Sequence, residues 1–434
     1  MFVLSFFLRW QYVAGSEEMV HLLQDAARYF TNAYNLWHHD AHSLDPPAMQ
    51  EPKTRTDHTP GFPLFLTLFF EDPPDSRTIK PQVQMAQAVM GSMTVVATLL
   101  LAALCLPFGW AMLAAVLVAI NPHHIALAQV MLTETLYTFL LMLGLLAAIY
   151  GWRYSKLLLV LAGMAMLGFS GHVRMIGFVV PAVLAPLLLL APAAVASRSL
   201  VERCKVGGAG LIGLALVYFW YQQFSAQYMQ APPATEVVME EGWTKVKPAE
   251  TYVTTSATPP RFFVEGVSHV IPQNGDPKLR YRTRQSFSEV PGSYLLWNCC
   301  GRWVYSWHFD NVYNGGAEIY PMRKSAFIDN GLQRVLHDLM LWAHWPLYAL
   351  AAAGGFFVVF TSLKQLLRGR CSDAFLVSAS FLGFVVALNI IHYLPRYTIP
   401  MRPLSYVLAS LALYSFVSWL LQRRQFKMGI QSQR

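Results

Sequence analysis

Charged side chains are scarce in this sequence. Only 13% of its 434 residues are Asp, Glu, Lys or Arg, whereas 55% are hydrophobic, and the mean hydropathy is +0.37. Soluble domains carry roughly 25% charged residues. The shortage of charge therefore excludes an ordinary soluble domain and predicts an all-α polytopic membrane protein.

Cysteine is also rare, with five residues in the whole chain. Their spacing matches no zinc-binding pattern. Cys299 and Cys300 are adjacent, and adjacent cysteines bridge each other only with strain. The chain also lacks the glycine-rich loops that hold nucleotide phosphates, so we expect no nucleotide-sugar site.

Long apolar runs recur along the chain, and a bilayer crossing needs ~20 mostly apolar residues. Met1–Leu8 is too short to cross, so we interpret it as the end of a first span and expect the reading frame to continue upstream. With it, about ten spans are predicted. The other nine lie near Val83–Leu106, Phe108–Ile120, Val130–Trp152, Leu157–Phe169, Ile176–Val195, Gly207–Phe224, Asp338–Leu363, Ala374–Ile391 and Leu404–Leu421.

Basic residues gather at the ends of alternate spans, and with ten spans all of these clusters fall on one side. Positively charged loops mark the cytoplasmic side of a membrane protein. This predicts a cell inner-membrane protein with both termini in the cytoplasm. The net charge of +8 forms no continuous patch, so we expect no nucleic-acid partner. The clusters are Arg153 and Lys156; Arg198, Arg203 and Lys205; Lys364, Arg368 and Arg370; and Arg423, Arg424 and Lys427.

This orientation places two long polar stretches outside, at residues 10–77 and 225–337. Apolar residues recur at helical spacing over Glu17–Trp37, which predicts an interfacial amphipathic helix. The apolar run from Pro60 suggests a second one, and the aromatic stretch Val290–Trp307 is expected to lie along the bilayer surface. We divide the chain into a catalytic core with the first outer loop (1–224), a second outer loop (225–337) and a C-terminal group of spans (338–434).

Two acids in the predicted outer region are candidates for chemistry. Asp25 could accept a proton from a substrate hydroxyl or bind a cation, or it could be a solvated acid on an interfacial helix. Glu134 opens a span just after Asn121-Pro122. An acid beside lipid costs ~2.5–3.5 kcal/mol on insertion scales, so it usually faces a cavity and has a role. The alternative is an interfacial acid exposed to water.

Two arginines on the predicted outer side are candidates for phosphate binding. Arg396 precedes Tyr397 and follows His392, between two spans, and Arg174 lies in a similar turn. The planar guanidinium suits a pair of phosphate oxygens. An arginine that snorkels to the membrane surface beside an interfacial tyrosine would give the same sequence pattern. However, positive residues on the outer side are unexpected from the positive-inside rule, which favours a functional role.

Histidines are frequent in the predicted outer segments, and some of them could join Asp25 or Glu134 around a metal ion. No pair has a diagnostic helical spacing, so a divalent cation stays open as a cofactor and no other cofactor is expected. These residues are His38, His39, His42, His58, His123, His124 and His172.

Several short motifs, in this order, resemble the GT-C superfamily of membrane glycosyltransferases, specifically bacterial relatives of protein mannosyltransferases and lipid A aminoarabinose transferases. That family often has Asp-Glu where this chain has Asp25-Ala26, which leaves Glu17 and Glu18 as competing first acids. The matching segments are Asp25-Ala26-Ala27-Arg28-Tyr29, Pro60-Gly61-Phe62-Pro63, Asn121-Pro122, Thr133-Glu134, Val173-Arg174 and Arg396-Tyr397-Thr398-Ile399-Pro400.

The resemblance implies a GT-C-like bundle with interfacial helices in two outer loops. It implies an inverting transfer of a sugar from a polyprenyl-phosphate donor to a hydroxyl of a lipid, glycan or protein acceptor. Asp25 would deprotonate the acceptor, and Glu134 would orient the acceptor or a cation. The residues expected to bind substrate are Arg396, Tyr397, Arg174, His392, Tyr29 and His58.

Two other classes of function compete with this interpretation. A transporter or lipid flippase would favour short outer loops and internal repeats, whereas the outer loops here are long and no repeat is evident. A polymerase or ligase that joins preassembled glycans would share the outer-face chemistry, and Arg396 would suit it equally.

The orientation is tested by labelling single cysteines in a background without native cysteines. We expect Glu51→Cys and Gly266→Cys to react with an impermeant thiol reagent added outside, and Lys364→Cys to be protected, because only the last lies next to a basic cluster. Labelling of Lys364→Cys from outside would reverse the orientation.

Overall fold

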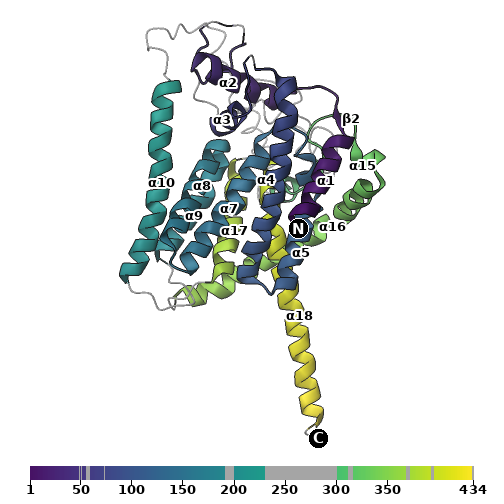
Figure 1. Ribbon diagram of the computed structural model, residues 1–434. Helices are drawn as coiled ribbons and strands as arrows, with labels where there is room; N and C mark the ends of the chain where they lie inside the picture. The colour runs from purple at the N-terminus through teal and green to yellow at the C-terminus, as the bar shows by residue number, and fades with distance from the viewer. Residues whose placement is uncertain are drawn as a thin grey trace, which may run out of the picture.

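The structure is a computed structural model in which helices form almost all of the regular structure (Figure 1). The part of the chain that it describes comprises residues 1–47, 49, 51–54, 59–72, 74–190, 200–229, 301–310, 316–367, 372–391 and 395–432.

The helices that make up the bundle match the apolar runs of the sequence. Among the described residues, five helices are long and apolar enough to cross a membrane, and four shorter apolar helices pack with them. Each of the nine complete spans predicted from the sequence falls on one of these helices, which confirms an all-α multi-pass membrane protein. They are α4 (Ser76–Cys105), α5 (Phe108–Ala119), α7 (Thr133–Arg153), α8 (Leu157–Val173), α9 (Val179–Leu190), α10 (Leu200–Tyr228), α16 (Gly331–Leu367), α17 (Asp373–Ile391) and α18 (Arg402–Ser432).

The N-terminal helix α1 (Phe2–Gly15) is longer than the sequence suggested. The expected apolar start ended at Leu8 because Arg9 follows it, but Arg9 is buried inside the bundle and the helix continues. The first outer loop therefore begins at Ser16 instead of Trp10. At about 1.5 Å per residue, the 14 residues of α1 extend about 21 Å, less than the ~30 Å of a hydrocarbon core.

The first outer loop also starts differently from the prediction. Glu17–Glu18 form strand β1, which pairs antiparallel with β2 (Met322–Lys324). Helix α2 begins only at Asp25 and runs to His39, so the helix predicted from Glu17 was wrong by eight residues. Local periodicity could not reveal this, because the strand partner comes from Met322–Lys324 and Gln24 interrupts the helix with a positive φ of 46°.

Helices α2 and α3 (Gly61–Thr67) cover one end of the bundle, at the top of Figure 1. Aromatic contacts join α2 to α3 and to the residues that follow α3. The ring centroids of Tyr29 and Phe62 lie 5.2 Å apart, and those of Phe30 and Phe70 lie 5.7 Å apart. The second short helix expected after Pro60 is thus confirmed.

The second outer stretch is described from residue 301 to 310 and again from 316. It contains α14 (Arg302–Ser306) and α15 (Ala326–Asp329), and α16 starts at Gly331, seven residues before the expected Asp338. Trp307 was expected at the bilayer surface. Instead it is buried and stacks on Tyr348 of α16 at 4.5 Å. Cys299 and Cys300 lie outside the described residues.

Helices α7 and α8 approach closely because small residues line their contact. A Cβ atom added to Gly163 would lie 2.4 Å from the Ala148 nitrogen and 2.7 Å from the Gly144 oxygen. Membrane helices pack through such small residues, since lipid supplies no hydrophobic force between them. This contact holds the middle of α7 against α8.

We expect Gly163→Val to lower stability by roughly 1–3 kcal/mol, the usual cost of overpacking. Thermal unfolding of the purified protein in detergent measures the effect. Gly208→Val on α10 is the matched control, because a Cβ there meets nothing within 4 Å. Equal loss in both variants would mean that the α7–α8 contact is not tight.

Candidate active site

Four charged side chains from distant parts of the chain form one connected set beneath α2. Arg396, in the 3-10 helix η5 (Pro395–Met401), donates from Nη1 to Asp25 Oδ2 at 2.8 Å and from Nε to Glu134 Oε1. Arg174 Nη1 lies 2.6 Å from the same Glu134 oxygen. We call Asp25, Glu134, Arg174 and Arg396 the acid–arginine cluster.

Both carboxylates of the cluster stand at the start of a helix. Asp25 is the first residue of α2, and Glu134 lies in the first turn of α7. The N-terminus of a helix carries a partial positive charge that stabilises an anion. The Asp25 side chain retains 24% of its exposure, whereas the Glu134 side chain has none. Asp25 is therefore the carboxylate of the cluster that solvent reaches.

Arg174 has contacts besides its ion pair with Glu134. Arg174 follows the end of α8 and precedes the 3-10 helix η1 (Met175–Phe178). Its guanidinium lies 4.6 Å from the centre of the Tyr397 ring and donates to Thr133 Oγ1 at 3.2 Å. A cation over an aromatic face is attracted by the ring's quadrupole. Tyr397 thus supports Arg174, while its neighbour Arg396 reaches the acids.

The charges of the cluster cancel. Two guanidiniums meet two carboxylates, and Arg174, Arg396 and Glu134 are all buried. A buried charge is tolerated when it is paired and hydrogen-bonded. The alternative that Glu134 is a water-exposed interfacial acid is wrong, and so is the alternative that Arg396 snorkels to the membrane surface.

The structure also resolves which acid of the first outer loop lies at this site. Glu17 pairs with Arg323 at 3.3 Å, and Glu18 pairs with Lys80 at 2.9 Å. Both acids belong to β1 and its surroundings, and Asp25 is the one that contacts Arg396.

The remaining predicted residues divide into two groups. Tyr29 lies beside the cluster: burial raises the pKa of its phenol, and the Asp25 carboxylate raises it further. His58 and His392 lie outside the described residues. Within the described ranges, no group of three or more His, Cys, Asp or Glu side chains is placed to hold a metal ion.

Sequence reasoning missed Tyr320, which comes from the second outer stretch. It is 2% exposed. Burial raises the pKa of this phenol, and the charges of Arg396, Asp25 and Glu134 act on it as well. An isolated tyrosine in a long loop carries no sequence signal for such a position.

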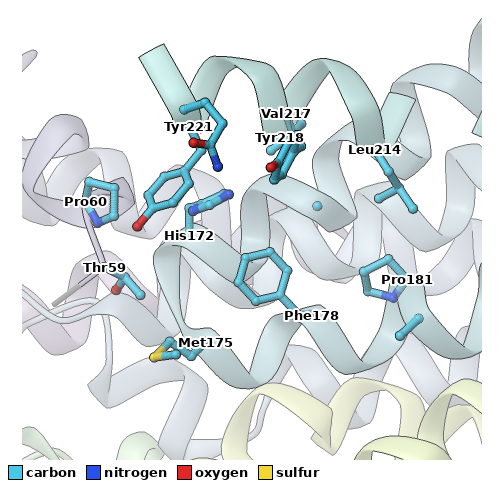
Figure 2. Close-up of a pocket in the computed structure, with 13 residues that line it drawn as sticks. Thr59, Pro60, His172, Met175, Phe178, Pro181, Leu214, Val217, Tyr218 and Tyr221 are labelled. Carbon is cyan, nitrogen blue, oxygen red and sulfur yellow. The ribbon is translucent and has the colours of Figure 1, made fainter. Parts of the chain in front are cut away.

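An apolar groove lies on the other side of the turn that carries Arg174 (Figure 2). Its volume is about 460 Å³. His172 reaches into it and stacks on Tyr221 of α10 at 4.3 Å, while Phe178 forms the floor beside them. Thr59 closes one end by donating to the Val173 carbonyl at 3.0 Å. The lining residues are Thr59, Pro60, Gly168, His172, Met175, Phe178, Pro181, Ala182, Leu214, Val217, Tyr218, Tyr221 and Gln222.

No protein-family model and no curated protein sequence matches this chain. Solved structures do. The oligosaccharyltransferase AglB of Archaeoglobus fulgidus, in complex with an inhibitory peptide and a dolichol-phosphate, superposes with a TM-score of 0.54 at 13% identity, over 99% of this chain and 51% of AglB. The complex of the same enzyme with Zn and sulfate gives a TM-score of 0.52 at 13% identity, over the same shares of both chains. ArnT of Cupriavidus metallidurans, bound to undecaprenyl phosphate, gives 0.49 at 12% identity, over 95% of this chain and 59% of ArnT.

The two AglB matches define the fold. The chain has a GT-C-like fold, which confirms the fold expected from its motifs. It spans about half the length of AglB. At 13% identity the likeness concerns the fold, so the reaction has to be argued from the site.

Glu134→Gln should destabilise the protein by roughly 3–5 kcal/mol, because removing one member of a buried ion pair leaves an uncompensated charge. Arg174 would lose the acid it pairs with. Asp25→Asn should cost much less, since Asp25 is partly exposed and Arg396 keeps Glu134. Thermal unfolding of both variants in the same detergent compares them. If Asp25→Asn proved the more damaging, Glu134 would not be the anchor of the cluster.

Proposed function

We propose that this protein is a membrane glycosyltransferase. It moves a sugar from a polyprenyl-phosphate donor to an acceptor hydroxyl at the outer face of the membrane. The acceptor is a lipid, glycan or protein.

One observation carries the proposal: the acid–arginine cluster and the apolar groove share a turn. Arg174 faces the cluster, and His172, two residues earlier, faces the groove. Met175 and Tyr218 on the groove's lining are 70% and 57% exposed, so the groove opens toward the lipid side of the bundle. A donor with an isoprenoid tail and a phosphate head fits this pair of neighbouring sites.

Arg396 is the residue best placed to take the donor phosphate. It donates to the acids through Nε and Nη1, and among the described residues Nη2 has no hydrogen-bond partner. Arginine binds phosphate through two parallel N–H groups. Arg174 lies on the other side of Glu134 and adds a second positive charge. Both would stabilise the negative charge that develops on the leaving phosphate.

Asp25 is the proposed general base. The acceptor oxygen attacks the anomeric carbon of the sugar and passes its proton to Asp25. The bond between that carbon and the phosphate oxygen breaks, and the polyprenyl phosphate leaves with the electron pair. Attack opposite the leaving group inverts the anomeric configuration. Asp25 now shares Arg396 with Glu134, so an incoming phosphate would compete with Asp25 for that guanidinium.

Glu134 has a positioning role in this scheme. The sequence suggested contact with the acceptor or a cation, but the side chain is fully buried between two guanidiniums. We therefore assign it to holding Arg174 and Arg396 at a fixed separation for the phosphate. The structure of AglB in complex with a dolichol-phosphate supports a lipid phosphate as the ligand here.

Asp25→Asn tests the base directly. The assay follows transfer from a labelled polyprenyl-phosphate sugar pool in membranes that contain the full chain, with products detected by mass. Loss of a general base typically lowers the rate by roughly 10²- to 10⁴-fold. We therefore expect the transfer rate of Asp25→Asn to fall ~10³-fold, while the variant still binds the donor. Asp72→Asn is the control, since Asp72 is an exposed acid of the same outer loop.

Arg396→Lys separates donor binding from turnover in the same assay. It keeps the charge but loses the planar fork, so we expect weaker donor affinity, seen as a raised KM, with a smaller effect on kcat. Full transferase activity in Asp25→Asn would remove the base assignment. Donor binding unchanged in Arg396→Ala would remove the phosphate site and with it the main support for the proposed function.

A further inference from the structure

A polar cavity of about 340 Å³ lies at the start of α16, and it shares no lining residue with the acid–arginine cluster. Its walls come from residues on either side of β2, from α15 and from the first turns of α16. In Figure 1, α15 lies at the right, below β2. The charged and polar side chains of the lining are Glu318, Ser325, Arg334, His337 and Asp338.

Contacts with two neighbouring helices fix the wall that α15 provides. The ring centroids of Tyr12 on α1 and Phe327 on α15 lie 4.5 Å apart, and the backbone nitrogen of Ala326 donates to Ser16 Oγ at 3.0 Å. The Phe327 ring also lies 5.3 Å from the ring of His337 on α16. Packing against α1 and α16 therefore sets the shape of the cavity.

Glu318 brings a negative charge to the cavity that the described residues do not neutralise. Tyr12 donates its hydroxyl to Glu318 Oε1 at 2.6 Å, and Ser325 donates to the same oxygen. Among the described residues, Oε2 has no hydrogen-bond partner and no basic side chain forms an ion pair with this carboxylate. The two hydroxyls orient the carboxylate and leave its second oxygen free for a cationic donor.

The wall that α16 provides carries charges of both signs. Arg334 and Asp338 lie one turn apart on the helix, and both are exposed. In the described part of the chain, Arg334 pairs with no acid, while Asp338 Oδ1 lies 3.1 Å from Nδ1 of His337. With the histidine counted as neutral, two acids and one arginine give the lining one net negative charge. The lining therefore suits a ligand that carries a positive and a negative group close together.

An exposed apolar face of α16 begins beside the cavity. Four exposed apolar side chains recur there every three or four residues, which places them on one side of the helix. They are Leu332, Val335, Leu339 and Trp342. Ile328, on the cavity wall itself, is 71% exposed. Such a face on a membrane-spanning helix is a contact surface for lipid tails.

The length of α16 places the cavity at the level of the lipid headgroups. The part of α16 that could span a membrane, Gly331–Ser362, has 32 residues. At ~1.5 Å per residue it extends about 48 Å, whereas the hydrocarbon core is ~30 Å thick. Charged side chains avoid the centre of the bilayer, so part of the excess length lies at the end that carries Arg334 and Asp338.

A purely structural role accounts for only some of these residues. Arg334 and Asp338 are exposed and could simply be solvated charges at the start of a helix. Glu318 is different, because its half-buried carboxylate is held by donors from two separate elements and by no cation. A buried or half-buried charge usually has a partner of opposite charge, and here a ligand can supply it.

We propose that this cavity binds the headgroup of phosphatidylethanolamine. The ammonium group donates to Glu318, the phosphate accepts from Arg334, and the acyl chains lie along the exposed face of α16. Hydrogen bonds between ionised groups are the strong ones. A choline headgroup carries methyl groups in place of the ammonium N–H donors, so it cannot make the bond to Glu318. The inference does not rest on the proposed function, because it uses no residue of the acid–arginine cluster or of the apolar groove.

The first experiment titrates the full chain, purified in detergent, with short-chain phosphatidylethanolamine and, separately, with phosphatidylcholine of the same chain length. Thermal unfolding reports binding, because a ligand of the folded state raises Tm. We expect a saturable rise in Tm with the ethanolamine lipid. The apparent affinity for the choline lipid should be roughly tenfold lower or less, since it lacks one hydrogen bond between charged groups.

Substitutions in the cavity separate the two halves of the headgroup. Glu318→Gln keeps an acceptor for Tyr12 and Ser325 but removes the charge, so we expect roughly tenfold weaker binding of the ethanolamine lipid and no preference over choline. Arg334→Gln should weaken both lipids alike, because they share the phosphate. Asp329→Asn is the matched control, since Asp329 is an exposed acid of α15 outside the cavity.

Two further measurements cover poor folding and a soluble ligand. If Glu318→Gln lowers the stability of the ligand-free protein, native mass spectrometry of the folded fraction still compares how much of each lipid the chain retains. Phosphoethanolamine, the headgroup without its tails, should bind far more weakly than the lipid. Equal affinity for the two would overturn the assignment to a lipid, because the apolar face of α16 would then add nothing.

The proposal fails if the ethanolamine and choline lipids raise the Tm of the wild type equally, or if Glu318→Gln keeps the preference for ethanolamine. It also fails if Asp329→Asn loses that preference, because the effect would then not belong to the cavity. None of these outcomes bears on sugar transfer, which the Asp25→Asn assay tests separately.

Discussion

The guanidinium of Arg396 bonds two carboxylates at once, and the end of the bundle beneath α2 is organised around it. Through Asp25 it holds the start of α2, and through Glu134 it holds the start of α7. Both bonds lie where water is largely excluded, so each charge needs the others. Arg174 supplies the second positive charge that balances the two carboxylates, and it connects this centre to the end of α8.

The outer segments place the reachable acid over this centre. Strand β1 pairs with β2, and Glu18 binds Lys80 of α4, so the chain before α2 is fixed at two points. Contacts between Tyr29 and Phe62 then fix α2 against α3. The result leaves the Asp25 side chain partly exposed while the Glu134 side chain is fully buried.

Arg396 of η5 and Arg402, the first residue of α18, show the same residue type in opposite electrostatic settings. Arg396 is neutralised by two acids, whereas Arg402 faces histidines and a helix N-terminus. The first arrangement balances its charges within the protein. The second has no carboxylate partner among the described residues.

The sequence by itself determined the class of the protein and much of its site chemistry. Hydropathy located nine of the bundle helices, since membrane insertion depends on local composition. Short motifs selected Asp25, Glu134, Arg174 and Arg396 as candidates. Charge rules gave an orientation that remains a prediction.

Only the tertiary structure decided which of these residues meet. Arg396 lies 371 residues from Asp25 and 262 from Glu134, and no local pattern encodes such pairings. The same limit explains the misplaced start of α2, which depends on a strand partner far along the chain, and the burial of Trp307, which resembled an interfacial aromatic in sequence. Whether an arginine is neutralised or left unpaired depends on what packs around it, and packing is a property of the folded chain alone.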